Sequence, residues 1–192
     1  MLLKLPLFSF IVFLFLVTPT YSYAQSQHDR NVTFEELTAT TSENHLILFG
    51  TLQNSFTSEM IEILHSGIPL HFTFYIELFK TAENWPDELI SELTLDHTMS
   101  FDTLKDNYKV TLEEENNKTL SVRSLFEAQK IINEINGAEV VELSQLIPDN
   151  LYKLKIRAEL YRKTLPMSLH NVLPFFSWWD IKTEWHTIEL KY

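Results

Sequence analysis

The chain has 192 residues, of which 45% are hydrophobic and 21% charged, and it contains no cysteine. This composition can bury a core and differs from that of a disordered chain, and the length indicates one domain. The formal net charge of −11 argues against nucleic-acid binding, because an acidic surface repels phosphate backbones, and the missing cysteines exclude disulfides and lipidation at a processed cysteine.

The first 24 residues have the pattern of a cleavable export signal. Lys4 is followed by an apolar run from Leu5 to Val17, and Ser22-Tyr23-Ala24 places small residues where a signal peptidase requires them. We expect cleavage between Ala24 and Gln25, which leaves residues 25–192 as a single periplasmic domain that is not a lipoprotein. A retained membrane anchor is the alternative, although the run is shorter than the ~20 apolar residues that span a bilayer as a helix.

Alternating hydrophobicity predicts several strands. The clearest are His71 to Phe79 and Leu151 to Tyr161, in which apolar and polar side chains alternate strictly, as in strands with one buried face. His45 to Leu52 reads as a strand that is partly buried on both sides. Tyr108 to Val122 reads as a hairpin with Asn116-Asn117 at its tip, because asparagine tolerates positive φ.

Three segments have helical spacing instead. Phe56 to Ser66 is predicted to be an amphipathic helix capped by Ser55, and a second helix is predicted to begin at Ser124 and to end at Asn136-Gly137. Leu165 to Phe176 suggests one or two further helical turns.

These elements predict a mainly β fold. Eight or nine strands with two or three short amphipathic helices favour an antiparallel β-sandwich, of which the immunoglobulin-like arrangement is one form. The alternative is an α+β fold with an open antiparallel sheet covered by helices on one face. In the last segment, Trp178 to Tyr192, the alternation slips between Trp185 and Ile188, and one β-bulge would account for the slip.

No catalytic, metal-binding or cofactor-binding residues are predicted. The seven histidines show none of the spacings that ligate zinc, and there is neither a G-x-S-x-G nucleophile motif nor a phosphate-binding loop. Asp96, Asp102 and Asp106 offer a carboxylate pair for sugar hydrolysis, but they are better explained as turn and cap residues of a polar connection. We therefore expect a protein that is not an enzyme.

Two features are candidate partner-binding surfaces. One is the group of tryptophans near the C-terminus, Trp178, Trp179 and Trp185. The other is a basic stripe in an acidic protein, formed by Lys153, Lys155, Arg157, Arg162 and Lys163. Exposed aromatic rings and clustered cations both anchor partner proteins. Core packing of the tryptophans and ordinary solvated pairing of the basic residues are the competing interpretations.

Several short stretches follow one another in a recognisable order and spacing: Gly67-Ile68-Pro69, Phe72-Thr73-Phe74, Ser124-Leu125 with Glu127-Ala128, Tyr152-Lys153-Leu154, Ala158-Glu159-Leu160, Leu165-Pro166, Phe175 to Asp180, Thr183-Glu184-Trp185 and Tyr192. In this order and spacing they resemble a known bacterial family, domain of unknown function 4390. The resemblance implies an exported protein without assigned activity or catalytic residues. Members of that family are in some proteobacteria encoded beside a membrane sensor kinase of the nitrogen-regulation type, which implies an accessory role in envelope sensing.

Three functions follow as hypotheses. The first is a non-enzymatic periplasmic binding or adaptor domain that contacts a membrane or envelope protein. The second is a binder of a small ligand or lipid, in which the short helices cover an apolar opening between sheets. The third is an envelope hydrolase, which would need convergent polar groups in a cleft.

Overall fold

The computed structural model describes residues 31–84, 86–162 and 181–192. Within these ranges the elements in chain order are β1 (Thr33–Thr41), β2 (His45–Gln53), α2 (Ser58–His65), β3 (Leu70–Lys80), β4 (Glu88–Asp102), β5 (Asn107–Leu112), β6 (Lys118–Val122), α3 (Leu125–Asn133), β7 (Glu134–Glu142), a 3-10 turn (Leu143–Gln145), β8 (Leu151–Arg162), β9 (Ile181–Lys182) and β10 (His186–Lys191).

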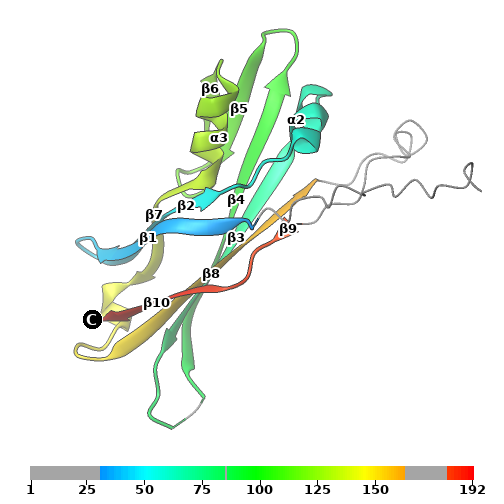
Figure 1. Ribbon diagram of the computed structural model, residues 1–192. Coiled ribbons are helices and arrows are strands. Elements are labelled where there is room, and N and C mark those ends of the chain that lie inside the picture. Colours follow the sequence, from blue (N-terminus) through cyan, green and yellow to red (C-terminus); the bar gives the residue numbers. More distant parts are fainter. Residues whose placement is uncertain (1–30, 85, 163–180) are drawn as a thin grey trace, which may run out of the picture.

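The described strands form two antiparallel sheets, which lie across one another in Figure 1. The small sheet has the order β1-β2-β7, and the large sheet has the order β10-β8-β3-β4-β5-β6, with β9 also paired to β8. This confirms the predicted mainly antiparallel β fold with short helices. An immunoglobulin domain places strands ABED in one sheet and CFG in the other. The observed strand order differs from this arrangement.

The core lies between the two sheets and under the helices. The inward side chains of β3 are the alternate residues Phe72, Phe74, Ile76 and Leu78, and those of β8 are Tyr152, Leu154, Ile156, Ala158 and Leu160, all of them buried. The alternation predicted for both strands is therefore confirmed. Phe74 of the large sheet contacts Phe34 of the small sheet, with ring centroids 6.2 Å apart, so the two sheets share one core.

Both helices pack on the same side of the large sheet as the small sheet (Figure 1). The predicted cap of α3 is confirmed, because the Ser124 hydroxyl accepts a hydrogen bond from the Glu127 amide. The predicted cap of α2 is wrong: Thr57, not Ser55, accepts from the Met60 amide. The Ser55 hydroxyl is instead buried and donates to Asn133 at the end of α3, so a tertiary contact replaces the local one.

Helix α3 ends earlier than predicted. Asn133 is its last residue, and β7 starts at Glu134 without a loop. Glu134 and Ile135 pair with Thr51 and Gly50 of β2, so strand pairing overrides the helical periodicity that the sequence shows up to Ile135. The abrupt change leaves the last carbonyls of the helix without an intrahelical partner.

The polar stretch that includes Asp96 was predicted to be a connection between elements. In the structure it is part of the long strand β4. It reads as a loop because its outward side chains are nearly all polar. Asp102 and Asp106 are turn residues as expected: the Asp102 carboxylate accepts from the amides of Leu104 and Lys105, and Asp106 has a positive φ of 50°.

The phase slip near the C-terminus lies between β9 and β10. From the Glu159–Lys182 pair to the Ile156–His186 pair the C-terminal chain advances four residues against three on β8, so one extra residue is accommodated there, as the predicted bulge would do. At the break the Thr183 hydroxyl accepts from the Ala158 amide, and the Thr183 amide donates to the Ala158 carbonyl. The Thr183 hydroxyl thus takes the place of a backbone carbonyl in the pairing with β8. The chain pairs with β8 again from His186, and from there the even-numbered instead of the odd-numbered side chains are the more buried ones.

Another β-bulge occurs in the edge strand β1, where the pairing register with β2 shifts between Glu35 and Thr38. Glu36 has a positive φ of 54° there. The bulge lays Leu37 over Gly50, and a Cβ atom at Gly50 would lie 2.6 Å from Leu37 Cδ2. Glycine fits this strand position without displacing Leu37, whereas a larger residue would require the flexible end of the Leu37 side chain to shift.

In the described ranges, no helix is long and apolar enough to cross a membrane. The predicted signal cleavage between Ala24 and Gln25 and the helical turns predicted at Leu165 to Phe176 lie outside the described residues.

Candidate functional site

The basic residues predicted as a partner surface lie on the outward side of β8. Lys153, Lys155 and Arg157 alternate with the buried residues of that strand, so they project from the side of the large sheet opposite to the core. On one side β8 pairs with β3 and on the other with β10, which sets outward residues of three strands beside one another.

Arg157 lies between two aromatic rings. Its guanidinium carbon is 4.8 Å from the ring centroid of Tyr75 on β3 and 4.8 Å from that of Trp185, which directly precedes β10. One terminal nitrogen is 3.4 Å from the Glu159 carboxylate, and in the described part of the chain the buried Nε has no hydrogen-bond partner. The cation is held mainly by the two ring faces.

A second cation–aromatic pair extends this arrangement. Lys155 Nζ lies 4.6 Å from the ring centroid of Phe79, and Glu77 is the residue opposite Lys155 in the β3–β8 pairing. None of the ion pairs seen among the described residues includes Lys155. We call the group formed by Tyr75, Phe79, Lys153, Lys155, Arg157 and Trp185 the cation–aromatic face.

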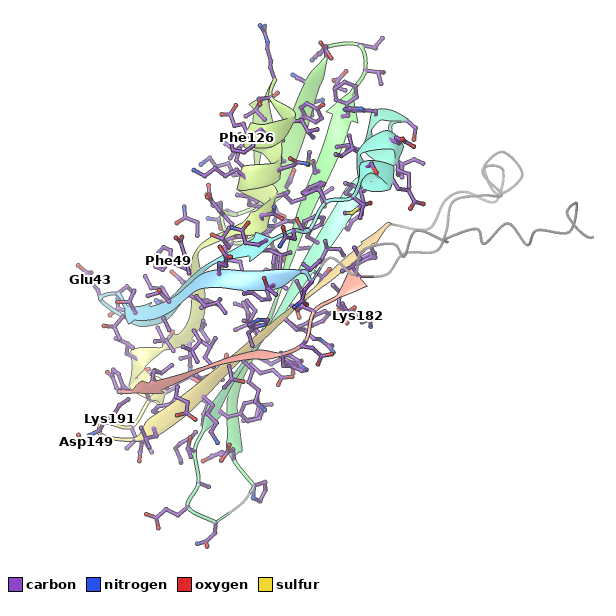
Figure 2. The ribbon with its side chains drawn as sticks, viewed as in Figure 1. Glu43, Phe49, Phe126, Asp149, Lys182 and Lys191 are labelled. Atoms are coloured by element: carbon purple, nitrogen blue, oxygen red, sulfur yellow. The ribbon has the colours of Figure 1, made fainter. Side chains whose placement is uncertain are left out.

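Carboxylates balance the other two cations of the face. Lys153 Nζ is 3.0 Å from Asp87 Oδ2, and Glu159, the partner of Arg157, also binds Lys182 of β9 at 3.0 Å. Figure 2 shows Lys182 at the end of β9, beside β8. The competing interpretation of a paired strand face is therefore correct for Lys153 and Arg157. Lys155 makes no ion pair among the described residues, but its charge also helps to lower the pKa of Asp87.

The hydroxyl of Tyr75 stays protonated on this face. Partial burial raises the pKa of Tyr75 above its ordinary value, and the nearby Glu159 carboxylate and Tyr161 raise it further, against the opposing effect of Arg157. The face therefore presents a neutral phenol that can donate or accept a hydrogen bond.

The Lys153–Asp87 ion pair should make the stability of the fold depend on pH. The hydrogen bond from Lys153, followed by the one from the Ala82 amide, holds the pKa of Asp87 below its ordinary value. The paired carboxylate thus stabilises the fold above the ordinary Asp pKa of about 3.9, and this contribution is lost as the pH falls through the lowered pKa. In an NMR pH titration we expect Lys153→Met to raise the Asp87 midpoint and Lys182→Met to leave it unchanged. Equal midpoints in the wild type and Lys153→Met would contradict the pairing.

The structure brings four of the predicted surface residues together: Lys153, Lys155, Arg157 and Trp185. Trp178, Trp179 and Lys163 lie outside the described residues, and Arg162 is described only as the last backbone position of β8. Tyr75 and Phe79 were missed as members of the site. Their signal was present, because both fall on the polar side of the alternation that predicted β3.

A second polar contact that the sequence did not reveal is buried on the inward side. His97 Nε2 lies 2.7 Å from Glu114 Oε2, and the two side chains are 0% and 3% exposed. Because both side chains are buried, we assign this pair to the core. In the described ranges, no three His, Asp or Glu side chains are grouped so that they could hold a metal ion.

The model of the family described as domain of unknown function (DUF4390) matches residues 29–189. No curated protein matches the chain significantly. No solved structure matches it significantly either.

Proposed function

We propose that this chain, which belongs to the DUF4390 family, is a non-enzymatic periplasmic adaptor domain that binds a membrane protein through its cation–aromatic face. The observation that carries the proposal is the stacking of Arg157 between Tyr75 and Trp185. Arginine, tyrosine and tryptophan are the side chains that most often dominate the energetics of protein interfaces.

The position of the face supports this role. The inward side of the large sheet is occupied, because Phe72 packs on Phe56, Phe74 on Phe34 and His97 on α3. In the described part of the chain both helices and the small sheet lie on that inward side (Figure 1), while the cation–aromatic face lies on the opposite one. Stacking also fixes the guanidinium and the rings in place, so little side-chain entropy is lost when a partner binds.

The charge of the face defines the chemistry of the partner. The whole chain is acidic, whereas Lys155 faces the ring of Phe79 and the opposite Glu77 and makes no ion pair among the described residues. A partner that presents a carboxylate to Lys155 and an apolar surface to Trp185 would complement the face. We propose the periplasmic part of a membrane sensor as that partner, in keeping with the predicted export signal.

Site-specific photo-crosslinking tests the proposal. A p-benzoylphenylalanine residue at Thr187, which is exposed and opposite Lys155 in the β8–β10 pairing, should crosslink to a membrane protein in envelope fractions. The control position is Phe126, which is 78% exposed and projects from α3 away from the large sheet (Figure 2). Crosslinks from Phe126 alone, or from neither position of a folded protein, would contradict the proposal.

Substitutions then identify the residues that bind. Arg157→Ala should weaken capture by about 30-fold, the equivalent of a hot-spot loss of about 2 kcal/mol. Lys130→Ala is the matched control, because Lys130 is an exposed ion-paired cation on α3, and it should have no effect. Thermal unfolding of each variant separates a lost contact from a lost fold, and equal capture by the two folded variants would contradict the assignment of the face.

A further inference from the structure

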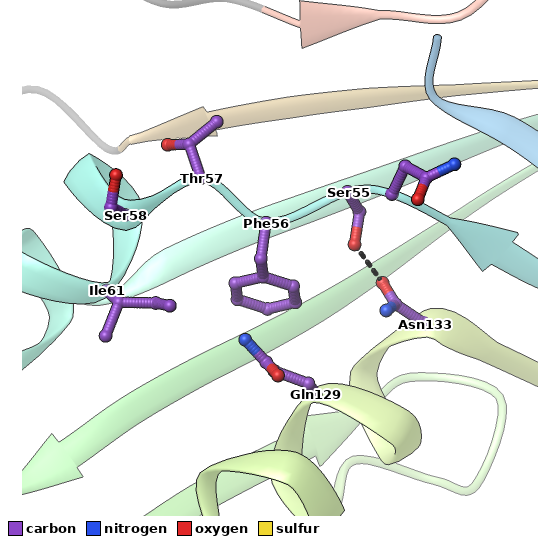
Figure 3. A pocket seen from close by; sticks show the side chains of 8 residues that line it. Ser55, Phe56, Thr57, Ser58, Ile61, Gln129 and Asn133 are labelled. Atoms are coloured by element: carbon purple, nitrogen blue, oxygen red, sulfur yellow. Dashed lines mark hydrogen bonds between the residues drawn. The ribbon is translucent and has the colours of Figure 1, made fainter. Parts of the chain in front are cut away.

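A groove with a different chemistry lies between the two helices. It has a volume of about 450 Å³, and its walls come from the segment that leads into α2 and from α3. Figure 3 shows Gln129 reaching from α3 towards the ring of Phe56 and Asn133 reaching from the same helix towards Ser55, with Ile61 of α2 on the other side of the ring. The sequence led us to expect an apolar opening between sheets, whereas this groove lies between helices and most of its lining is polar.

The lining combines neutral hydrogen-bonding groups with a small apolar floor. Its polar members are three carboxamides, from Asn54, Gln129 and Asn133, and the hydroxyls of serine and threonine, and no charged side chain is among them. Phe56 and Ile61 supply the apolar part. A groove without charge gives an ionic ligand nothing to replace its hydration, so an uncharged ligand is favoured.

A buried contact orients one of these carboxamides. The Ser55 hydroxyl, in a residue that is 1% exposed, donates to Asn133 Oδ1 at 2.7 Å. With its oxygen occupied in this way, Asn133 presents the two N–H donors of Nδ2 to a ligand. In the described part of the chain, no protein group bonds to the Gln129 carboxamide, which can therefore both donate and accept.

We propose that this groove binds a neutral sugar residue. A sugar ring has an apolar C–H face, which would pack on Phe56 and Ile61, and a rim of hydroxyls that donate and accept, which matches the carboxamides of Gln129 and Asn133. The volume of about 450 Å³ falls within the range of about 300–1,000 Å³ found for small-molecule sites, and it holds one or two sugar units. This site is separate from the cation–aromatic face and does not depend on its function.

NMR titration of the mature chain tests the site with four probes: glucose, maltose, N-acetylglucosamine and chitobiose. At least one should shift the side-chain amide signals of Gln129 and Asn133 while leaving that of Asn117, at the tip of the β5–β6 hairpin, unmoved. The proposal is overturned if none of the four moves the groove signals more than that of Asn117. Where glucose is a probe that binds, glucose 6-phosphate should bind more weakly than glucose, and equal shifts of the groove signals by the two would contradict a neutral site.

A matched pair of variants adds a second readout. Gln129→Ala removes a groove carboxamide and should weaken sugar binding about fivefold, the equivalent of one neutral hydrogen bond. Gln145→Ala removes an exposed carboxamide from the 3-10 turn, away from the groove, and should leave binding unchanged. Equal affinities of the two variants would overturn the assignment even if a sugar binds elsewhere.

Discussion

Glu114→Ala is expected to lower the free energy of unfolding by about 3–5 kcal/mol, because it removes one partner of a buried pair and leaves the other without compensation. His97 is fully buried and uses both ring nitrogens: Nδ1 lies 2.8 Å from the Ile132 carbonyl and Nε2 lies 2.7 Å from Glu114 Oε2. A carbonyl oxygen only accepts, so the ring donates through Nδ1. Nε2 then either donates to the carboxylate or accepts from the protonated acid, and both arrangements require Glu114.

This contact joins three parts of the fold. His97 is on β4, Glu114 is in the turn after β5, and Ile132 is in the last turn of α3. Since α3 passes directly into β7, no amide of a further helical turn donates to the Ile132 carbonyl. The His97 ring donates to this carbonyl instead. The loss of Glu114 therefore weakens the attachment of α3 as well as the hairpin.

Urea unfolding of three variants measures the effect. Glu115→Ala is the matched control, because Glu115 is in the same turn and pairs with Lys118, a largely exposed residue; it should cost less than about 1 kcal/mol. Glu114→Gln keeps an oxygen that accepts from Nε2 and should fall between the two. If Glu114→Ala costs no more than Glu115→Ala, the pair does not stabilise the fold.

Phe74→Ala is expected to cost about 3–5 kcal/mol, as is typical when a large buried ring is truncated and a cavity remains. Phe74 is fully buried on β3. It contacts Phe34 of the small sheet and the ring of His97, whose centroid is 4.9 Å away at an interplanar angle of 63°. Its removal loosens the contact between the sheets and the packing around the buried pair together.

A second phenylalanine supplies the control for this variant. Phe126→Ala deletes the same atoms from a side chain that is 78% exposed on α3, so its effect should stay within about 0.5 kcal/mol. Both are measured by thermal and urea unfolding. Similar losses in the two variants would show that the ring of Phe74 is not a structural link between the sheets.

The strands that the sequence predicts well are those with one strictly apolar side. β3 and β8 are the clearest cases, and both were predicted with their inward residues. β4 was only partly predicted, because its outer side chains around Asp96 are polar enough to read as a loop. The end of α3 was predicted too late, since the pairing of Glu134 and Ile135 with β2 is a tertiary contact that local periodicity does not contain.

The candidate sites also depend on tertiary contacts that the local sequence pattern does not contain. The basic residues and Trp185 were recognised, but the stacking of Trp185 on Arg157 follows from the pairing of β10 with β8, which no local pattern specifies. His97 could have been found, because it falls in phase with the inward residues Leu95 and Met99. Glu114 had no such signal, since it faces His97 only once the hairpin turn is formed.

The contact of Leu37 with Gly50 affects the order in which substitutions at these two positions are accepted during evolution. A methyl at the flexible end of Leu37 occupies the space that a Cβ atom at Gly50 would need, so a larger residue at position 50 fits when that methyl moves aside, when position 37 becomes smaller or when the bulge in β1 is lost. A lineage that first shortens Leu37 passes through a chain with a small void, whereas one that first replaces Gly50 passes through a clash. Homologues should therefore vary at these two positions together, and an alanine or serine at position 50 should accompany a leucine at 37 less often than chance.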